Sequence, residues 1–332
     1  MTILSRRRFV RAAALGAGAV LSGHARHAVG APTTITVASL LAADKAETRV
    51  WFHIRDAVET MLPGRFEFRI VPNAALGGEK EVAEGSRLGS IQASLGTMSA
   101  LSTWVRDAQI LDLPFLFRDR EHVRRTLDGP LGTELRQAFL TQAFVVPAFI
   151  NYGARHLLGK MAMTAPADVR GRRIRVIQSP LHVALWKAFG AHPTPIPITE
   201  TYNALKTGVV DMMDLTWGAY AGFRLYEVVP WVTETGHIWA CGALYWSASF
   251  WARLAPAERR VLTDASISGA RQFDRMIVED EARAREQAAA GGARVVAPID
   301  RPAWVATARS VWAEAAPALG GMPRIEAIAT AA

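Results

Sequence analysis

The sequence contains one cysteine, Cys241, among 332 residues. A single thiol excludes an intrachain disulfide and a cysteine-based zinc cluster, so packing alone must stabilise the folded chain. A free cysteine usually lies in the apolar interior as a small hydrophobic residue. We therefore expect Cys241 to be buried.

The sequence also lacks the common catalytic motifs. It has no Gly-x-Gly-x-x-Gly after a strand, no Walker loop, no His-Glu-x-x-His and no Gly-x-Ser-x-Gly. None of its eight histidines has metal-ligand spacing with a partner. Asp211 and Asp214 are three apart on an expected strand, so they point to opposite faces and form no acid–base pair. We expect a binding protein that is not an enzyme and needs no cofactor or metal.

The sequence after residue 31 also lacks a strong net charge. The formal net charge is +8, but residues 1–31 hold five arginines and no acid, which leaves +3 for the rest. No stripe of Lys and Arg alternates with aromatic residues, so we expect no nucleic-acid partner. A weak positive field would favour anionic solutes.

The N-terminus has the pattern of an export signal. Ser5-Arg6-Arg7-Arg8-Phe9 precedes an apolar run over 12–21, and this resembles a twin-arginine signal. Ten apolar residues are too few to span a bilayer. We expect cleavage after Ala31 and a periplasmic location, with a retained membrane anchor as the alternative.

After residue 31, two segments repeat a strand–helix–strand–helix–strand order, which predicts parallel sheets joined by right-handed crossovers. The first set covers 34–38, 42–62, 66–71, 79–88 and 91–96. The second covers 173–177, 179–189, 194–198, 200–207 and 210–215. A strand over 243–249, a very long helix over 256–290 and a helical region over 301–332 follow.

Ligands of open α/β sheets bind beyond the carboxyl ends of the strands. The residues at those ends are Thr97 to Ala100, Arg155, Arg175 and Asp214. We expect a cleft between two lobes there.

Several collinear segments resemble the solute-binding subunit of tripartite ATP-independent periplasmic (TRAP) transporters, the DctP-like family. They are 72–78 with 85–89, Leu113–Phe117, Asp168–Val176, Gly190–Pro197 and Tyr202–Asp211. The resemblance implies a two-lobed α/β periplasmic binding protein fold with a long helix along both lobes. We expect lobe I over 32–152 and about 240–270, lobe II over 153–239 and about 285–332, and the connecting helix over about 256–290.

The resemblance implies that Arg175 pairs with a ligand carboxylate, because a guanidinium offers two parallel N–H donors and stays charged. Arg155 would share the carboxylate or join the lobes. Gln178 would contact the ligand or cap a helix. Thr97 and Ser99 occupy positions where relatives place hydrogen-bond donors.

The sequence departs from the family after Asp211. Asp214 and Leu215 stand where many relatives have glutamate and asparagine. With Ile198, Trp217 and Trp239, they predict a more apolar pocket. The expected ligand is a monocarboxylate with an apolar or aromatic body, or a branched 2-hydroxy or 2-oxo acid. The two tryptophans could instead be core residues, and we expect His237 to be structural.

The resemblance further implies a monomer that delivers a small organic acid to one small and one large membrane permease subunit. Three alternatives stay open at this point. They are a binding protein of another importer, a sensory co-receptor and a periplasmic enzyme that acts on a carboxylate.

Overall fold

A computed structural model describes residues 31–331. The predicted leader, its cleavage site and the possible anchor therefore lie outside the described residues, apart from Ala31. Among the residues described, no helix is both long enough and apolar enough to cross a bilayer.

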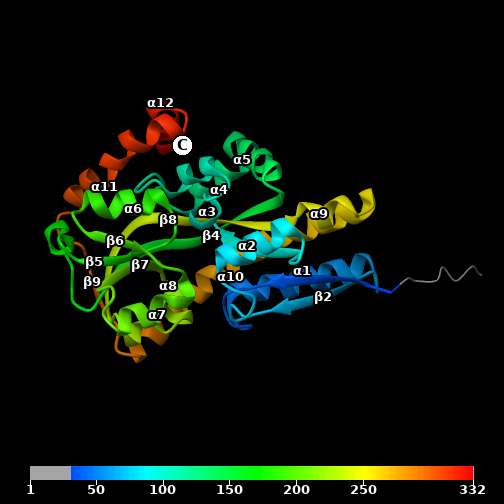
Figure 1. Cartoon of the computed structure of the whole chain (residues 1–332), viewed down its shortest axis with the longest axis horizontal. Helices are drawn as coiled ribbons and strands as arrows, with labels where there is room; N and C mark the ends of the chain where they lie inside the picture. Colours follow the sequence, from blue (N-terminus) through cyan, green and yellow to red (C-terminus); the bar gives the residue numbers. More distant parts are fainter. Residues whose placement is uncertain (1–30, 332) are drawn as a thin grey trace, which may run out of the picture.

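One continuous mixed sheet runs through the molecule, in the order β2-β1-β3-β8-β4-β7-β5-β6, with β9 beside β8 (Figure 1). Its strands are β1 (Thr33–Ala38), β2 (Phe66–Val71), β3 (Ala93–Thr97), β4 (Phe144–Gly159), β5 (Arg173–Val176), β6 (His192–Pro195), β7 (Met212–Thr216), β8 (Trp231–Ser247) and β9 (Arg294–Val296).

The helices cover the sheet and link its strands. They are α1 (Ala46–Met61), α2 (Glu79–Leu88), α3 (Met98–Leu101), α4 (Arg120–Asp128), α5 (Pro130–Thr141), α6 (Pro180–Ala188), α7 (Ile198–Lys206), α8 (Trp217–Gly222), α9 (Ala248–Ala252), α10 (Pro256–Ala290), α11 (Arg301–Ala315) and α12 (Met322–Thr330), with short 3-10 turns η1 (Arg106–Asp112), η2 (Pro166–Val169), η3 (Leu225–Glu227) and η4 (Ala316–Ala318).

The first lobe is built on β1, β2 and β3, which pair in parallel as predicted. Helix α1 crosses between β1 and β2 and buries Val50, Ile54 and Val58. It begins at Ala46 instead of residue 42, because Lys45 has an extended backbone and serves as the N-cap. Met61, expected on the buried face, is exposed because it lies in the last turn, just before Pro63 ends the helix.

The second lobe repeats this construction with β5, β6 and β7. Strand β5 pairs in parallel with both β6 and β7, as expected. Helix α6 buries Leu181 and Leu185 on its inner side. The sequence predicts the parallel order in both lobes because each crossover helix carries an apolar stripe between two β-rich segments.

Two long strands, β4 and β8, join the lobes. They pair antiparallel along most of their length, with register shifts at three places between Val145 and Leu157. The sequence predicts only the last part of β8 and misses β4. Both faces of these strands are covered, and bulges interrupt the two-residue period, so the alternation that marks a half-buried strand is absent.

The 35-residue helix α10 runs along both lobes, as predicted (Figure 1). At 1.5 Å per residue it is about 50 Å long. Leu262 and Phe273 pack in the first-lobe core, and Ala284 and Ala288 pack in the second.

The C-terminal helices contact both lobes. Trp304 of α11 packs with Trp186 in the second lobe, whereas Trp312 and Ile325 pack with Leu111 in the first. Assigning residues 285–332 to the second lobe alone does not describe this packing.

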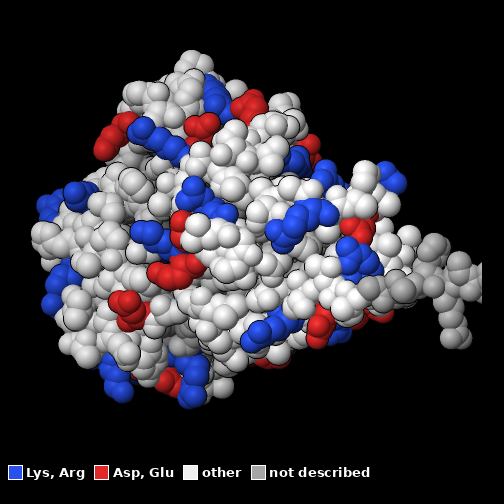
Figure 2. Space-filling view, turned by 45° about the vertical axis from the view of Figure 1, so that its right-hand side comes forward, with Lys and Arg blue, Asp and Glu red and all other residues white. Residues whose placement is uncertain are grey.

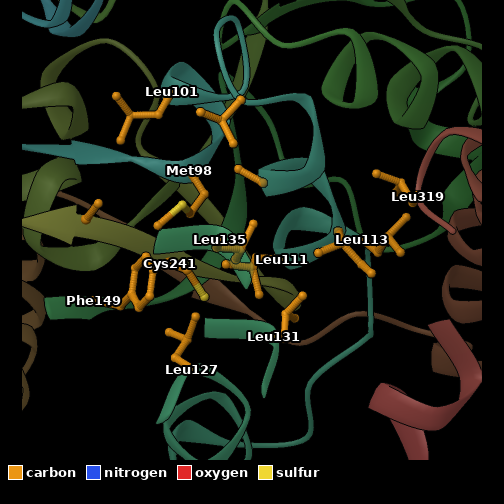
Figure 3. Close-up of a cluster of buried hydrophobic side chains, with 14 of the residues drawn as sticks. Met98, Leu101, Leu111, Leu113, Leu127, Leu131, Leu135, Phe149, Cys241 and Leu319 are labelled. Atoms are coloured by element: carbon orange, nitrogen blue, oxygen red, sulfur yellow. The ribbon is translucent and has the colours of Figure 1, made fainter. Parts of the chain in front are cut away.

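Cys241 lies in the apolar interior, as expected. It is buried among Leu127, Leu131 and Phe149 in a cluster formed by α3, η1, α4, α5 and the middle of the sheet (Figure 3). Burial raises the pKa of its thiol well above the usual value. The free thiol is thus a packing group.

Charges of both signs are mixed on the molecular face shown in Figure 2, with no continuous area of one sign. The small positive excess after residue 31 therefore produces no basic patch on this face.

Candidate functional site

A cavity of about 190 Å³ lies between the lobes. The first lobe contributes the segment from Leu40 to Glu47, together with Glu79 and Thr97. The second contributes Arg175, Ile198 and Leu215, strand β4 contributes Tyr152 and Arg155, and α10 contributes residues from Phe273 to Gln287. The cavity thus lies where the predicted strands end, as expected for an open α/β sheet.

Arg175 lies in this cavity wall and is only 2% exposed. Its Nε donates a hydrogen bond to the carbonyl oxygen of Ile196 at 2.8 Å, which fixes the plane of the guanidinium. Within residues 31–331, its two terminal nitrogens have no hydrogen-bond partner, and the side chain forms no ion pair with an acid. Four terminal N–H donors are therefore left for a molecule in the cavity.

Burial lowers the pKa of Arg175 to about 10, and the nearby charge of Arg155 acts in the same direction. The charges of Asp214 and Glu79 oppose this change. Arg175 thus remains a cation near neutral pH. A buried cation without a counter-ion is costly, and an anionic ligand would relieve that cost.

Arg155 also lines the cavity, but an acid already neutralises it. Its Nε donates to Oδ2 of Asp214 at 2.5 Å, and Nη2 donates to the Asp214 carbonyl oxygen at 2.7 Å. Strand β4 pairs with β7 here, Arg155 opposite Thr216, which places the guanidinium beside Asp214. Arg155 therefore joins the crossing strand to the second lobe and also faces the cavity.

Asp214 lies behind the wall and is fully buried. Burial acts to raise its pKa, but the Arg155 charge and a hydrogen bond with His237 hold it well below the usual value. Nε2 of His237 is 3.2 Å from Oδ2 of Asp214, and Nδ1 is 2.7 Å from the hydroxyl of Thr235. His237 is structural, as expected.

Three acids line the cavity from the first lobe, namely Asp44, Glu47 and Glu79, and Asp44 pairs with Lys45 at 3.3 Å. Oε1 of Glu47 accepts a hydrogen bond from the backbone N–H of Leu40 at 2.9 Å, and Oε1 of Glu79 accepts one from Thr97 at 2.7 Å. Burial raises the pKa of Glu47 to about 7, and the charge of Glu79 adds to the effect. Burial and the same two acids raise the pKa of Tyr152 well above its usual value.

A family model described as "Bacterial extracellular solute-binding protein, family 7" (DctP) matches residues 40–318. The chain belongs to the DctP family. This confirms the family that the sequence motifs predict.

Other members are similar along most of the chain. A solute-binding protein of Verminephrobacter eiseniae is 32% identical over 258 residues, 77% of each protein. A TRAP periplasmic solute-binding protein of Bradyrhizobium, solved with galacturonate, is 29% identical with a TM-score of 0.84, over 89% of this chain and 98% of that one. One from Polaromonas, bound to D-erythronate, is 26% identical with a TM-score of 0.86, over 90% and 98%. These matches confirm the two-lobed fold of this DctP-family protein.

The other predicted site residues of this DctP-family chain divide into two groups. Thr97, Ile198 and Leu215 line the cavity. Gln178 lines a small crevice beside it, which shares Arg175, Glu79 and Ile198 with the cavity. Arg175, Arg155, Thr97, Ile198 and Leu215 are therefore brought together, with Gln178 at the edge.

Asp214, Ser99, Trp217 and Trp239, which the sequence predicts as ligand contacts, do not line the cavity. Asp214 is used by Arg155. Ser99 is buried, with its hydroxyl 3.2 Å from Nε2 of His182. Trp217 is in the second-lobe core, and Trp239 packs at the first-lobe cluster with Arg120 above its ring. The aromatic residues that line the cavity are instead Tyr152, Phe223 and Phe273.

Sequence reasoning missed Glu47, Glu79 and Tyr152. A signal exists for both acids, because each lies on the apolar stripe of its helix. Glu47 precedes Val50 and Ile54 by three and seven positions, and Glu79 precedes Val82 by three. An acid on a buried stripe indicates either a buried ion pair or a site. The structure describes no group of three or more His, Cys, Asp or Glu side chains in residues 31–331 that could hold a metal ion.

Proposed function

We propose that this chain is the periplasmic solute-binding subunit of a TRAP transporter, and that it captures a small organic acid through Arg175. The observation that carries the proposal is the buried Arg175 guanidinium, which donates to Ile196 and forms no ion pair with an acid in the described part of the chain. A carboxylate matches two parallel N–H donors of this group. The Bradyrhizobium and Polaromonas relatives, solved with a uronate and an aldonate, support a carboxylate ligand.

Capture works by hinge closure. The carboxylate binds Arg175 when the lobes are apart, and closure brings Glu47, Glu79 and Thr97 of the first lobe over the ligand. A ligand that contacts both lobes stabilises the closed form by its differential affinity for the two states. The closed protein then docks, as a monomer, on the two membrane permease subunits, and an ion gradient drives uptake.

Binding without turnover completes the proposal. The cavity groups supply an anion site and hydrogen-bond acceptors, and three of its cations are neutralised: Arg155 by Asp214, Lys45 by Asp44 and Arg283 by Asp280. The chain is exported by a twin-arginine signal and carries neither a cofactor nor a catalytic residue. Incubation with a bound acid, followed by NMR, tests this part: the acid is recovered unchanged, whereas a new product would indicate an enzyme.

A thermal-shift panel tests the main proposal. The chain from residue 32 onward is heated with monocarboxylates, hydroxy acids, uronates and dicarboxylates, with neutral sugars and amino acids as controls. An acid at 100 times its Kd should stabilise the fold by about 2.7 kcal/mol. Arg175→Ala should abolish the shift. A panel in which no carboxylate raises the melting temperature contradicts the proposal.

A further inference from the structure

The first-lobe wall of the cavity carries Glu47 and Glu79 together with the ion pair of Asp44 and Lys45, whereas the second-lobe wall carries Arg175, unpaired within residues 31–331. Glu47 is only 6% exposed, and its Oε1 is taken by the Leu40 N–H. Glu79 uses its Oε1 for the Thr97 N–H. The Oε2 atoms of both side chains have no hydrogen-bond partner among residues 31–331, although each residue lines the cavity. Two acceptor oxygens are thus left for the contents of the cavity.

Tyr152 adds a third polar group to this side. Its side chain lines the cavity from β4, and its hydroxyl makes no hydrogen bond to the part of the chain that is described. Burial and the nearby acids raise its pKa, so the hydroxyl stays protonated and can both donate and accept.

Arg175 provides an independent sign of a ligand at the same cavity. It is 2% exposed with two unpartnered terminal nitrogens, and it lines the cavity together with both acids. A molecule that satisfies the whole cavity must therefore present an anion to Arg175 and hydrogen-bond donors to the first-lobe wall.

We propose, resting on the function proposed above, that Glu47 and Glu79 are specificity-determining residues that accept hydrogen bonds from ligand hydroxyl groups and exclude a second carboxylate. The ligand class is a hydroxylated monocarboxylate, such as an aldonate or a uronate, and not a dicarboxylate.

The physical reason is a difference between donors and anions. A hydroxyl group donates to a carboxylate oxygen and satisfies it, whereas a carboxylate has no proton to donate. A second carboxylate would also meet the negative charge of Glu79, in a partly buried site where charges interact more strongly than in bulk water. A ligand that leaves buried polar groups of the site without a hydrogen-bond partner binds much more weakly.

Two pairs of acids with matched carbon number test this proposal by calorimetric titration of the chain from residue 32 onward. The pairs are D-erythronate with succinate and D-glucuronate with D-glucarate. We expect the monocarboxylate of at least one pair to bind more tightly than its dicarboxylate partner by a factor on the order of ten or more. A dicarboxylate that binds as tightly as, or more tightly than, the monocarboxylate in both pairs overturns the proposal.

Two variants separate specificity from structure. Glu47→Gln and Glu79→Gln keep an oxygen for the backbone N–H but remove the charge. Each should weaken binding of the hydroxy acid and strengthen binding of the dicarboxylate, so the ratio of the two affinities decreases. If the two acids have only a structural role, both variants should weaken binding of both ligands to the same extent. That result would overturn the proposal. Glu59→Gln, on the exposed side of the same helix as Glu47, should leave the ratio unchanged.

The outcomes distinguish this proposal from the function on which it rests. If carboxylates bind, and Arg175→Ala abolishes the binding, but dicarboxylates are preferred, only the specificity assignment fails. If none of the four acids binds, and no acid of the wider thermal-shift panel does, the function itself fails and the specificity assignment falls with it.

Discussion

The two walls of the cavity differ in whether their buried charged side chains form ion pairs. In the second lobe, Arg155 and Asp214 neutralise each other, and the pKa of Asp214 falls well below its usual value. In the first lobe, Glu47 has no cationic partner within residues 31–331, and burial raises its pKa to about 7. The same contrast separates the arginines, because the pKa of Arg155 is raised whereas that of Arg175 falls to about 10. Arg155 lines the cavity but is neutralised by Asp214, whereas Arg175 and Glu47 line it without an ion-pair partner among residues 31–331.

The largest expected effect comes from removing the acid of the Arg155–Asp214 ion pair. Asp214→Asn removes the charge beside Arg155 and leaves a buried cation uncompensated, which should cost about 3–5 kcal/mol of unfolding free energy. Denaturant titration measures it. Asp211→Asn is the matched control, since Asp211 pairs with Arg173 near the surface and should cost under about 1 kcal/mol. Equal losses in the two variants would remove the distinction between a structural pair and a surface pair.

The next test removes the cation Arg175. Arg175→Ala should weaken carboxylate binding by about 2–5 kcal/mol, because it removes the one cavity-lining arginine that forms no ion pair within residues 31–331. The ligand-free variant should melt no lower than the wild-type chain, because a buried cation without a counter-ion is removed. Calorimetry and thermal melting give the two values. Unchanged affinity would show that the anion binds elsewhere.

The third test uses pH to sharpen the comparison. The pKa of Glu47 in the folded state, about 7, is above the usual glutamate value of 4.5, so the folded state takes up the proton more readily. Its contribution to stability is fully present below pH 4.5 and is lost as the pH rises through 7. Relative to wild type, Glu47→Gln should therefore gain about 3 kcal/mol between these limits.

The variant comparison is needed because buried histidines act in the opposite direction. Burial lowers the pKa of His156 to about 3 and lowers that of His237, so both favour folding as the pH rises. Unfolding curves of wild type and Glu47→Gln at pH 5 and pH 8 isolate the Glu47 contribution. A difference that does not vary with pH would mean that Glu47 is not buried as described.

The smallest expected effect concerns the aromatic residues outside the cavity. Trp239→Phe should change carboxylate affinity by less than about 0.5 kcal/mol, since the ring packs at the first-lobe cluster and under Arg120. Leu215→Ala, in the cavity wall, should weaken binding more. The reverse order, measured by calorimetry, would place the ligand nearer to Trp239.

Sequence patterns predict those parts of the fold in which local periodicity and burial agree. Parallel strands between amphipathic helices, and a helix as long as α10, follow from such patterns. The crossing strands β4 and β8 do not, because burial on both faces and register shifts remove the two-residue period.

The site residues likewise include some that the sequence predicts and some that it does not. The resemblance to a family identifies Arg175 because the residue lies in a collinear motif. The partner of Arg155 could not be predicted, because the ion pair depends on how β4 and β7 pair across 59 residues. Glu47 and Glu79 lie on the apolar stripes of their helices, which indicates either a buried ion pair or a site. The sequence does not decide between the two, because the placement of these helices over the cavity is set by packing against the sheet.

A crystal structure of the chain with D-erythronate or D-glucuronate tests the central claim most directly. We predict that the ligand carboxylate lies within hydrogen-bond distance of both terminal nitrogens of Arg175, with its hydroxyl groups directed at Glu47 and Glu79. A carboxylate bound away from Arg175, or a ligand bound outside this interlobe cavity, would contradict the account.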